Sequence, residues 1–192
     1  MKSTELLAPL VCLSMLAVPS AGAATLEGQR FDDHTRVADS ELLLNGLGVR
    51  AVFIIKGYVA GLYLDRKAAT LQEATAMPGP KRLQLRMLLN VGPEEFNKAL
   101  VAGIRKNASD AELVALNERI GQLERTISAF GPTVRGDVIN IDYVPEQGTT
   151  LAVNGAVKGP AIAGADFYHA VLGIFVGERP VDARLKKGLL GQ

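Results

Sequence analysis

Arg50 opens a strongly apolar stretch of the chain directly after a glycine-rich segment, and Tyr58 and Tyr63 follow within that stretch. If the strand formed there is covered on both faces, the guanidinium must reach the rim of the fold or meet an anionic partner, because an unpaired buried charge costs several kcal/mol. The alternative is an edge arginine that pairs with a carboxylate of the protein or is solvated, and composition alone favours this alternative. Tyrosines in such a stretch are typical of core positions whose hydroxyl bonds to the backbone.

Other kinds of reactive site have little support in the sequence. The two histidines, His34 and His169, stand far apart and have no second ligand at metal-binding spacing. No Ser-His-Asp set is recognisable, and Gly46-x-Gly48 lacks the third glycine and the following helix of a dinucleotide site. We therefore expect neither a metal nor a cofactor.

The N-terminal residues have the pattern of a secretory signal. Lys2 precedes the mostly apolar run from Leu6 to Val18, and Ala21-Gly22-Ala23 fits the small-x-small rule for cleavage. The run is shorter than the roughly 20 residues that span a bilayer, although an uncleaved anchor is the alternative. Cys12 lies inside the run without a lipoprotein context, so cleavage after Ala23 would leave no cysteine. The sequence predicts a periplasmic or secreted protein with a signal peptide at 1–23 and one domain at 24–192.

The length and charge of the chain fit this prediction. A chain of 192 residues is long enough for one domain with a hydrophobic core, and a formal net charge of +1 argues against a nucleic-acid partner. No other segment is apolar for long enough to cross a membrane, so we expect no membrane span after signal cleavage.

Alternation and turn signals predict an antiparallel sheet. Leu42–Gly48 is expected to be a strand that runs into a turn, and residues 50–64 are expected to form one further strand. Residues 83–89 and 139–143 alternate in the manner of half-buried strands, and Asn154-Gly155 is a strong hairpin signal.

Helical periodicity accounts for most of the remaining chain. A helix is expected from Pro93, and the next begins at Ser109, where Glu112 completes a capping box, and ends before Gly131. Residues 166–176 and 180–189 predict two more helices. Strands followed by paired helices, a hairpin and helices indicate an α+β fold in which helices cover one side of an antiparallel sheet.

Several sequence motifs, in this order and spacing, resemble the chalcone isomerase-like superfamily, and in particular its bacterial branch that carries signal peptides. The resemblance covers the chain from about Thr25 to Gly191. It is carried by the segments 44–50, 56–64, 92–95, 166–172 and 185–191. The resemblance implies an open-faced β-sandwich, in which a large antiparallel sheet carries a layer of helices and a ligand cleft lies between them.

The isomerase positions of the superfamily are mostly replaced in this chain. Its strand arginine matches Arg50, but its threonine falls on Tyr58, its helix tyrosine on Glu95, its asparagine on Ala102 and its C-terminal threonine on Ile174. The polar groups that polarise the ketone in the isomerases are thus absent, since such donors act only when correctly placed. The resemblance therefore argues against chalcone isomerisation, and if the chain is an enzyme, Arg50 is the candidate catalytic residue.

The fatty-acid-binding branch of the superfamily gives a closer match, because it pairs the arginine with a Tyr-x-x-Gly-x-Tyr strand like that from Tyr58 to Tyr63. The resemblance implies a binding site for a small amphipathic carboxylate at Arg50, Tyr58 and Tyr63, with Arg50 as its anchor. The alternatives are an isomerase or lyase that acts on an unknown enone, and a structural or partner-binding domain without a ligand. On one straight strand Arg50 and Tyr58 would be about 26 Å apart, so a shared site requires the chain to reverse between Val52 and Gly57.

Overall fold

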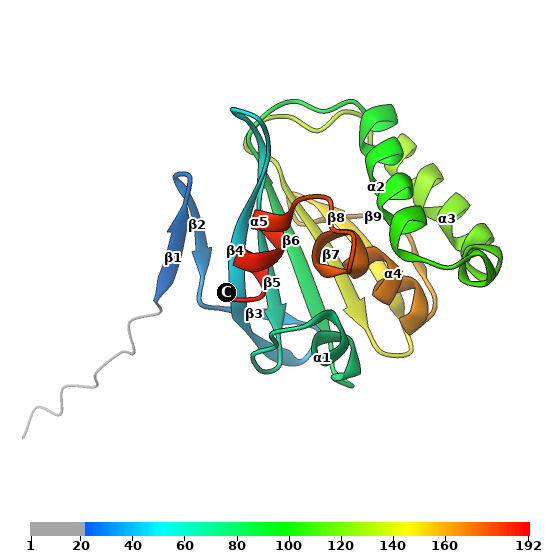
Figure 1. Cartoon of the computed structure of the whole chain (residues 1–192), viewed down its shortest axis with the longest axis horizontal. Helices are drawn as coiled ribbons and strands as arrows, with labels where there is room; N and C mark the ends of the chain where they lie inside the picture. The colour runs from blue at the N-terminus through cyan, green and yellow to red at the C-terminus, as the bar shows by residue number, and fades with distance from the viewer. Residues whose placement is uncertain (1–21) are drawn as a thin grey trace, which may run out of the picture.

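The computed structural model describes residues 22–192 as an antiparallel sheet with helices on one face (Figure 1). The predicted signal segment lies mostly outside the described residues. The strands are β1 (Ala23–Leu26), β2 (Gln29–Asp32), β3 (His34–Val37), β4 (Ser40–Val52), β5 (Ile55–Leu64), β6 (Lys81–Met87), β7 (Val138–Val144), β8 (Gly148–Val153) and β9 (Ala156–Ile162). The helices are α1 (Leu71–Ala76), α2 (Pro93–Asn107), α3 (Asp110–Phe130), α4 (Ala165–Val176) and α5 (Ala183–Leu189).

Seven strands form the main sheet in the order β3-β4-β5-β6-β7-β8-β9, and β1 and β2 form a separate hairpin. Every pair in the sheet is antiparallel and joins consecutive strands. The predicted α+β class and the helix-covered antiparallel sheet are confirmed. No helix within residues 22–192 is both long and apolar enough to cross a membrane.

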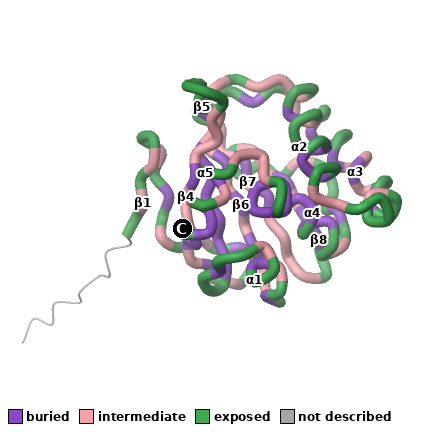
Figure 2. Tube along the Cα trace, in the orientation of Figure 1, coloured by how far each residue is buried: buried purple, intermediate pink, exposed green. Residues whose placement is uncertain are grey.

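The main core lies between the sheet and the helices. Alternate side chains of β6, Leu83, Leu85 and Met87, point into it and are at most 1% exposed, and α4 contributes buried residues along most of its length. Figure 2 shows this buried trace through the middle of the sheet and α4. The period-two pattern expected for residues 83–89 is therefore confirmed through Met87, where β6 ends.

The expected helices form, with small changes at their ends. At Ser109 the capping box is complete, because its side chain accepts from the Glu112 N–H while the Glu112 carboxylate accepts from the Ser109 N–H. The last helix begins at Ala183 rather than at Pro180, because the Asp182 side chain caps it. The expected Asn154-Gly155 hairpin joins β8 to β9.

The prediction of a turn near Gly48 followed by a single strand over residues 50–64 was wrong. β4 runs unbroken to Val52, Val52 pairs with Ile55, and the chain reverses at Phe53 and Ile54. The glycines of β4 serve helix packing instead, because a Cβ at Gly46 would overlap the carbonyl oxygen of Gly188 in α5. Residues 23–41 form β1, β2 and β3 and the first residues of β4.

Asn45 joins β4 to the C-terminal segment. It is the extra residue at a bulge in β4 and is 4% exposed. Its amide nitrogen donates to the carbonyl oxygens of Ala68 (2.9 Å) and Leu189 (2.7 Å), and its amide oxygen accepts from the Ala68 N–H at 2.8 Å. These bonds hold the end of α5 against β4, so they also fix the start of α5 beside Arg50.

Lys81, at the start of β6, is buried, and its environment predicts a pH effect on stability. Its ammonium group donates to the carbonyl oxygens of Met77 (2.6 Å) and Gly79 (2.9 Å), and burial lowers its pKa from 10.5 to about 8. The folded protein therefore releases this proton at a lower pH than the unfolded chain does. The resulting cost to stability is fully present below pH 8 and is lost as the pH rises toward 10.5.

We accordingly expect the free energy of unfolding of the wild type, minus that of Lys81→Met, to rise by about 1–3 kcal/mol between pH 7.5 and 10. Urea unfolding of both proteins at the two pH values measures this difference. Tyrosines, which titrate near pH 10 in the unfolded chain, are the same in both proteins, so their contribution cancels. A difference that does not change with pH would show that Lys81 keeps an ordinary pKa.

Candidate functional site

The β4–β5 hairpin brings Arg50 and Tyr58 side by side. They are directly paired across the two strands, and side chains of such a pair lie on one face with Cβ atoms about 4.5–5.5 Å apart. The chain reversal required for a shared site is therefore present, at Phe53 and Ile54. This juxtaposition depends on the position of the turn, which the sequence pattern misplaced.

Arg50 is partly buried and contacts a carboxylate of the protein. Its side chain is 25% exposed, and one terminal nitrogen, Nη1, donates to the Ala51 carbonyl oxygen at 2.7 Å and lies 3.5 Å from Asp182 Oδ2. Pairing with a protein carboxylate is the alternative that composition favoured. Both contacts use the same nitrogen, so Nε and Nη2 make no hydrogen bond within residues 22–192 and remain as donors for another group.

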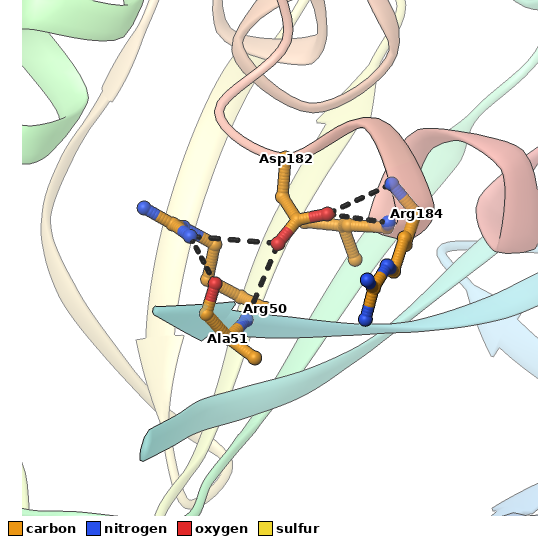
Figure 3. A network of polar contacts seen from close by, with 5 residues as sticks. Arg50, Ala51, Asp182 and Arg184 are labelled. Atoms are coloured by element: carbon orange, nitrogen blue, oxygen red, sulfur yellow. Dashed lines mark hydrogen bonds and ion pairs between the residues drawn. The ribbon is translucent and has the colours of Figure 1, made fainter. Parts of the chain in front are cut away.

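Asp182 is held mainly by backbone groups, as Figure 3 shows. Its Oδ1 accepts from the N–H groups of Arg184 (2.8 Å) and Leu185 (3.1 Å), and its Oδ2 accepts from the Ala51 N–H at 3.3 Å. Burial alone would raise the pKa of Asp182, but these backbone donors and the charge of Arg50 outweigh burial and lower it. Asp182 is thus an ionised helix cap, and its 3.5 Å contact with Arg50 is the longest of these contacts.

Tyr58 lies on the helix-facing side of the sheet. Its ring meets that of Phe175 edge-on at a centroid distance of 6.4 Å. Burial raises the pKa of its hydroxyl, partly offset by the charge of Arg50, so the phenol stays protonated and acts as a hydrogen-bond donor at neutral pH. The hydroxyl forms no hydrogen bond within residues 22–192, which leaves it available to a ligand.

A small apolar hollow adjoins Tyr58 between the sheet, α2 and α4. Its volume is about 260 Å³, slightly below the range of about 300–1,000 Å³ typical of sites for drug-sized ligands. Its lining is almost entirely apolar, with Glu95 and Tyr58 as the polar exceptions. The lining residues are Gly57, Tyr58, Leu85, Met87, Val91, Glu95, Phe96, Ala99, Leu100, Ile174, Phe175 and Val181.

Three of the positions aligned with the isomerase site meet at this hollow. Tyr58, Glu95 and Ile174 line it, whereas Ala102 is exposed on α2 and does not. Arg50 stands beside the hollow through its pairing with Tyr58, and Asp182 follows the lining residue Val181. The hollow therefore has an apolar interior and polar groups at its edge.

The structure does not bring Tyr63 to this hollow. Tyr63 and Tyr58 are an odd number of residues apart on β5, so their side chains point to opposite faces of the sheet. Tyr63 is 2% exposed, belongs to a second apolar cluster with Phe31 and Leu42, and donates its hydroxyl to the Asp32 carbonyl oxygen at 3.0 Å. It fills the role of a core tyrosine beneath the β1–β2 hairpin.

Sequence reasoning missed two features of the site. Asp182 could have been identified as a helix cap, because it precedes a helix whose apolar residues are Leu185 and Leu189. Its contact with Arg50 joins residues 132 positions apart, which no local pattern indicates. The lining contributed by Val91 and Ala99 likewise depends on how α2 packs over the sheet.

The sheet, its helix layer and the apolar hollow between them define the chalcone isomerase fold. The family model described as chalcone isomerase-like matches residues 23–191, so the chain belongs to the chalcone isomerase-like family. The predicted family is thereby confirmed.

The chain is similar to the crystal structure of a fatty-acid binding protein of Arabidopsis thaliana, with 15% identity and a TM-score of 0.65. The similarity covers 88% of this chain and 96% of the plant protein, and at this identity it shows the fold alone. No curated protein matches the sequence.

Proposed function

We propose that the protein binds a small amphipathic carboxylate of the fatty-acid type in the hollow beside Tyr58. The observation that carries the proposal is an apolar hollow whose edge has an unbonded phenol and a guanidinium with unused donors. An acyl chain in the hollow would gain about 0.8 kcal/mol per buried methylene. The carboxylate would accept hydrogen bonds from Tyr58 and Arg50, a charge-assisted arrangement.

The size of the hollow limits the ligand. A volume of about 260 Å³ fits a short acyl chain or the inner part of a longer one. Glu95 lines the same hollow and its negative charge opposes a second anion, so we place the carboxylate next to Tyr58 and Arg50. The fatty-acid binding of the Arabidopsis protein with the same fold supports this class of ligand.

The contact between Arg50 and Asp182 could also form in a structural domain without a ligand. This contact alone therefore does not distinguish a ligand-binding protein from such a domain. The hollow distinguishes the two alternatives, because a purely structural domain has no need of an apolar cavity beside a free phenol.

We further propose that the protein acts outside the cytoplasm, on the basis of the N-terminal pattern that ends at Ala23.

Blocking the hollow tests the proposed function. Ala99 is exposed at the edge of the hollow on α2, and an indole there would cover the opening. We expect Ala99→Trp to weaken the binding of decanoic acid by about tenfold or more, because the loss of only two buried methylenes has that effect. Isothermal titration of the delipidated protein measures the affinity.

Ala102→Trp is the matched control, because Ala102 is exposed on the same helix but does not line the hollow. It should bind decanoic acid as the wild type does. Equal affinities in the wild type and both variants would place the ligand elsewhere or exclude a specific site.

A further inference from the structure

Four consecutive large apolar residues are exposed at the end of the β4–β5 hairpin. Val52 is 51% exposed, Phe53 99%, Ile54 91% and Ile55 62%. Figure 2 shows this end of the hairpin as an exposed segment, and in Figure 1 it projects past the sheet. We call these four residues the hairpin tip. Isolated exposed apolar side chains are common on protein surfaces, but a contiguous group marks an interaction site.

The tip does not have the composition of an ordinary turn. Phe53 has a φ of 53°, in the left-handed region that glycine and asparagine occupy most readily. A bulky aromatic residue at this position is unfavourable for the local backbone. A glycine or asparagine would form the turn more easily and would also expose less apolar surface. The apolar side chains at the tip are therefore not explained by the turn itself.

Basic groups lie next to the tip. Ile54 and Ile55 share a shallow surface hollow with Lys56 and Arg135. Lys56 pairs with Glu27 at 2.6 Å, whereas the exposed side chain of Arg135 forms no ion pair within the described residues. An apolar end beside a net positive surface matches the acyl region of a bilayer and the phosphates above it.

We propose that the hairpin tip inserts into the surface of a phospholipid bilayer, with Phe53 and Ile54 among the acyl chains and Arg135 at the phosphates. Four side chains at the end of a narrow hairpin are too few for a stable protein interface, which buries roughly 1,000 Å² or more. A bilayer needs no complementary shape. The proposal stands apart from carboxylate binding, because Arg50 is not part of the tip.

A probe placed at the tip tests insertion directly. We would attach the environment-sensitive dye NBD to Ile54→Cys in the full chain with Cys12→Ser, and add vesicles of phosphatidylethanolamine and phosphatidylglycerol. The emission of NBD at position 54 should shift to the blue. The matched control is NBD at Val114→Cys, a residue that is 80% exposed on α3, a helix that Figure 1 shows apart from the β4–β5 hairpin. Its emission should not shift.

The position of the probe matters because the full chain carries the apolar segment Leu6–Val18, which can itself bind lipid. In the protein without a dye, part of the vesicle binding does not depend on Leu6–Val18. Phe53→Ser should weaken that part. We expect Phe53→Ser combined with Ile54→Ser to weaken it by about tenfold or more. Val114→Ser should leave vesicle binding unchanged. The Arg50→Gln variant should bind vesicles as the wild type does, even if this variant fails to bind decanoic acid.

Three results would overturn the proposal. The first is the absence of a blue shift at position 54, and the second is an equal shift at position 114. The third is a blue shift at position 54 that appears without vesicles and grows with protein concentration. That result would show that a second copy of the chain, rather than lipid, covers the tip.

Discussion

Replacing Gly46 with alanine is expected to lower the free energy of unfolding by about 3 kcal/mol or more, the upper end of the usual cost of overpacking. A Cβ at this position would overlap the carbonyl oxygen of Gly188, and that of Leu189 lies 2.9 Å away. Both are backbone atoms of the α5 segment, so no side chain can rotate to relieve the overlap. The measurement is urea unfolding followed by circular dichroism.

The control is Gly79→Ala, because nothing lies within 4 Å of a Cβ built at Gly79. It should change the free energy of unfolding by less than about 0.5 kcal/mol. If Gly46→Ala proved as mild as Gly79→Ala, α5 would not pack on β4 as closely as the structure shows. The position of Asp182 beside Arg50 would then be in question too, because Asp182 is the N-terminal cap of α5.

The second large effect concerns ligand binding. Arg50→Gln is expected to weaken the binding of decanoic acid by about tenfold, since a charge-assisted hydrogen bond contributes about 1.5–3 kcal/mol. We expect the lower end of that range because the Arg50 side chain is 25% exposed and solvent competes with the ligand. Binding of decanol, which has no charge, should change little. Titration of both compounds into both proteins measures the selectivity.

Arg66→Gln provides the matched control. Arg66 has a 65% exposed side chain and pairs only loosely with its neighbour Asp65, at 3.8 Å. The control should retain the wild-type preference for the acid. Folding of Arg50→Gln should be maintained, because Asp182 keeps its three backbone donors. An unchanged preference for the acid in Arg50→Gln would remove Arg50 from the site.

Much of the fold follows from patterns that extend over a few residues. The capping box at Ser109, the alternation of Leu83, Leu85 and Met87, and the Asn154-Gly155 turn each reflect local chemistry, and each is present in the structure. The antiparallel sheet with one helical layer then follows from the order of the elements. Burial of one face of a sheet requires such a layer.

The turn between β4 and β5 shows where local patterns fail. Gly46 and Gly48 resemble a turn, but they are small because α5 packs against them. Phe53 and Ile54 resemble the interior of a strand, but they form the turn. At Gly46 and Gly48 a contact with α5 determines the residue type, whereas the turn is formed by exposed apolar residues that do not favour a reversal of the chain. Local propensity therefore points the wrong way in both places.

The candidate site was predictable only in part for the same reason. Arg50 stands out by its residue type and Tyr58 through the family resemblance, and their pairing is present once the turn is placed correctly. Tyr63 shares the motif but faces the other side of the sheet, because its distance from Tyr58 along β5 is odd. The Asp182 contact and the hollow come from packing between distant segments.

The measurement that tests carboxylate binding most directly is methyl NMR during a titration with decanoic acid. The Ile174 and Leu100 methyl groups line the hollow, whereas Leu42 lies in the cluster on the opposite face. We expect the signals of Ile174 and Leu100 to shift saturably while that of Leu42 stays in place. Signals that do not shift, or a shift confined to Leu42, would contradict a binding site at Tyr58 and Arg50.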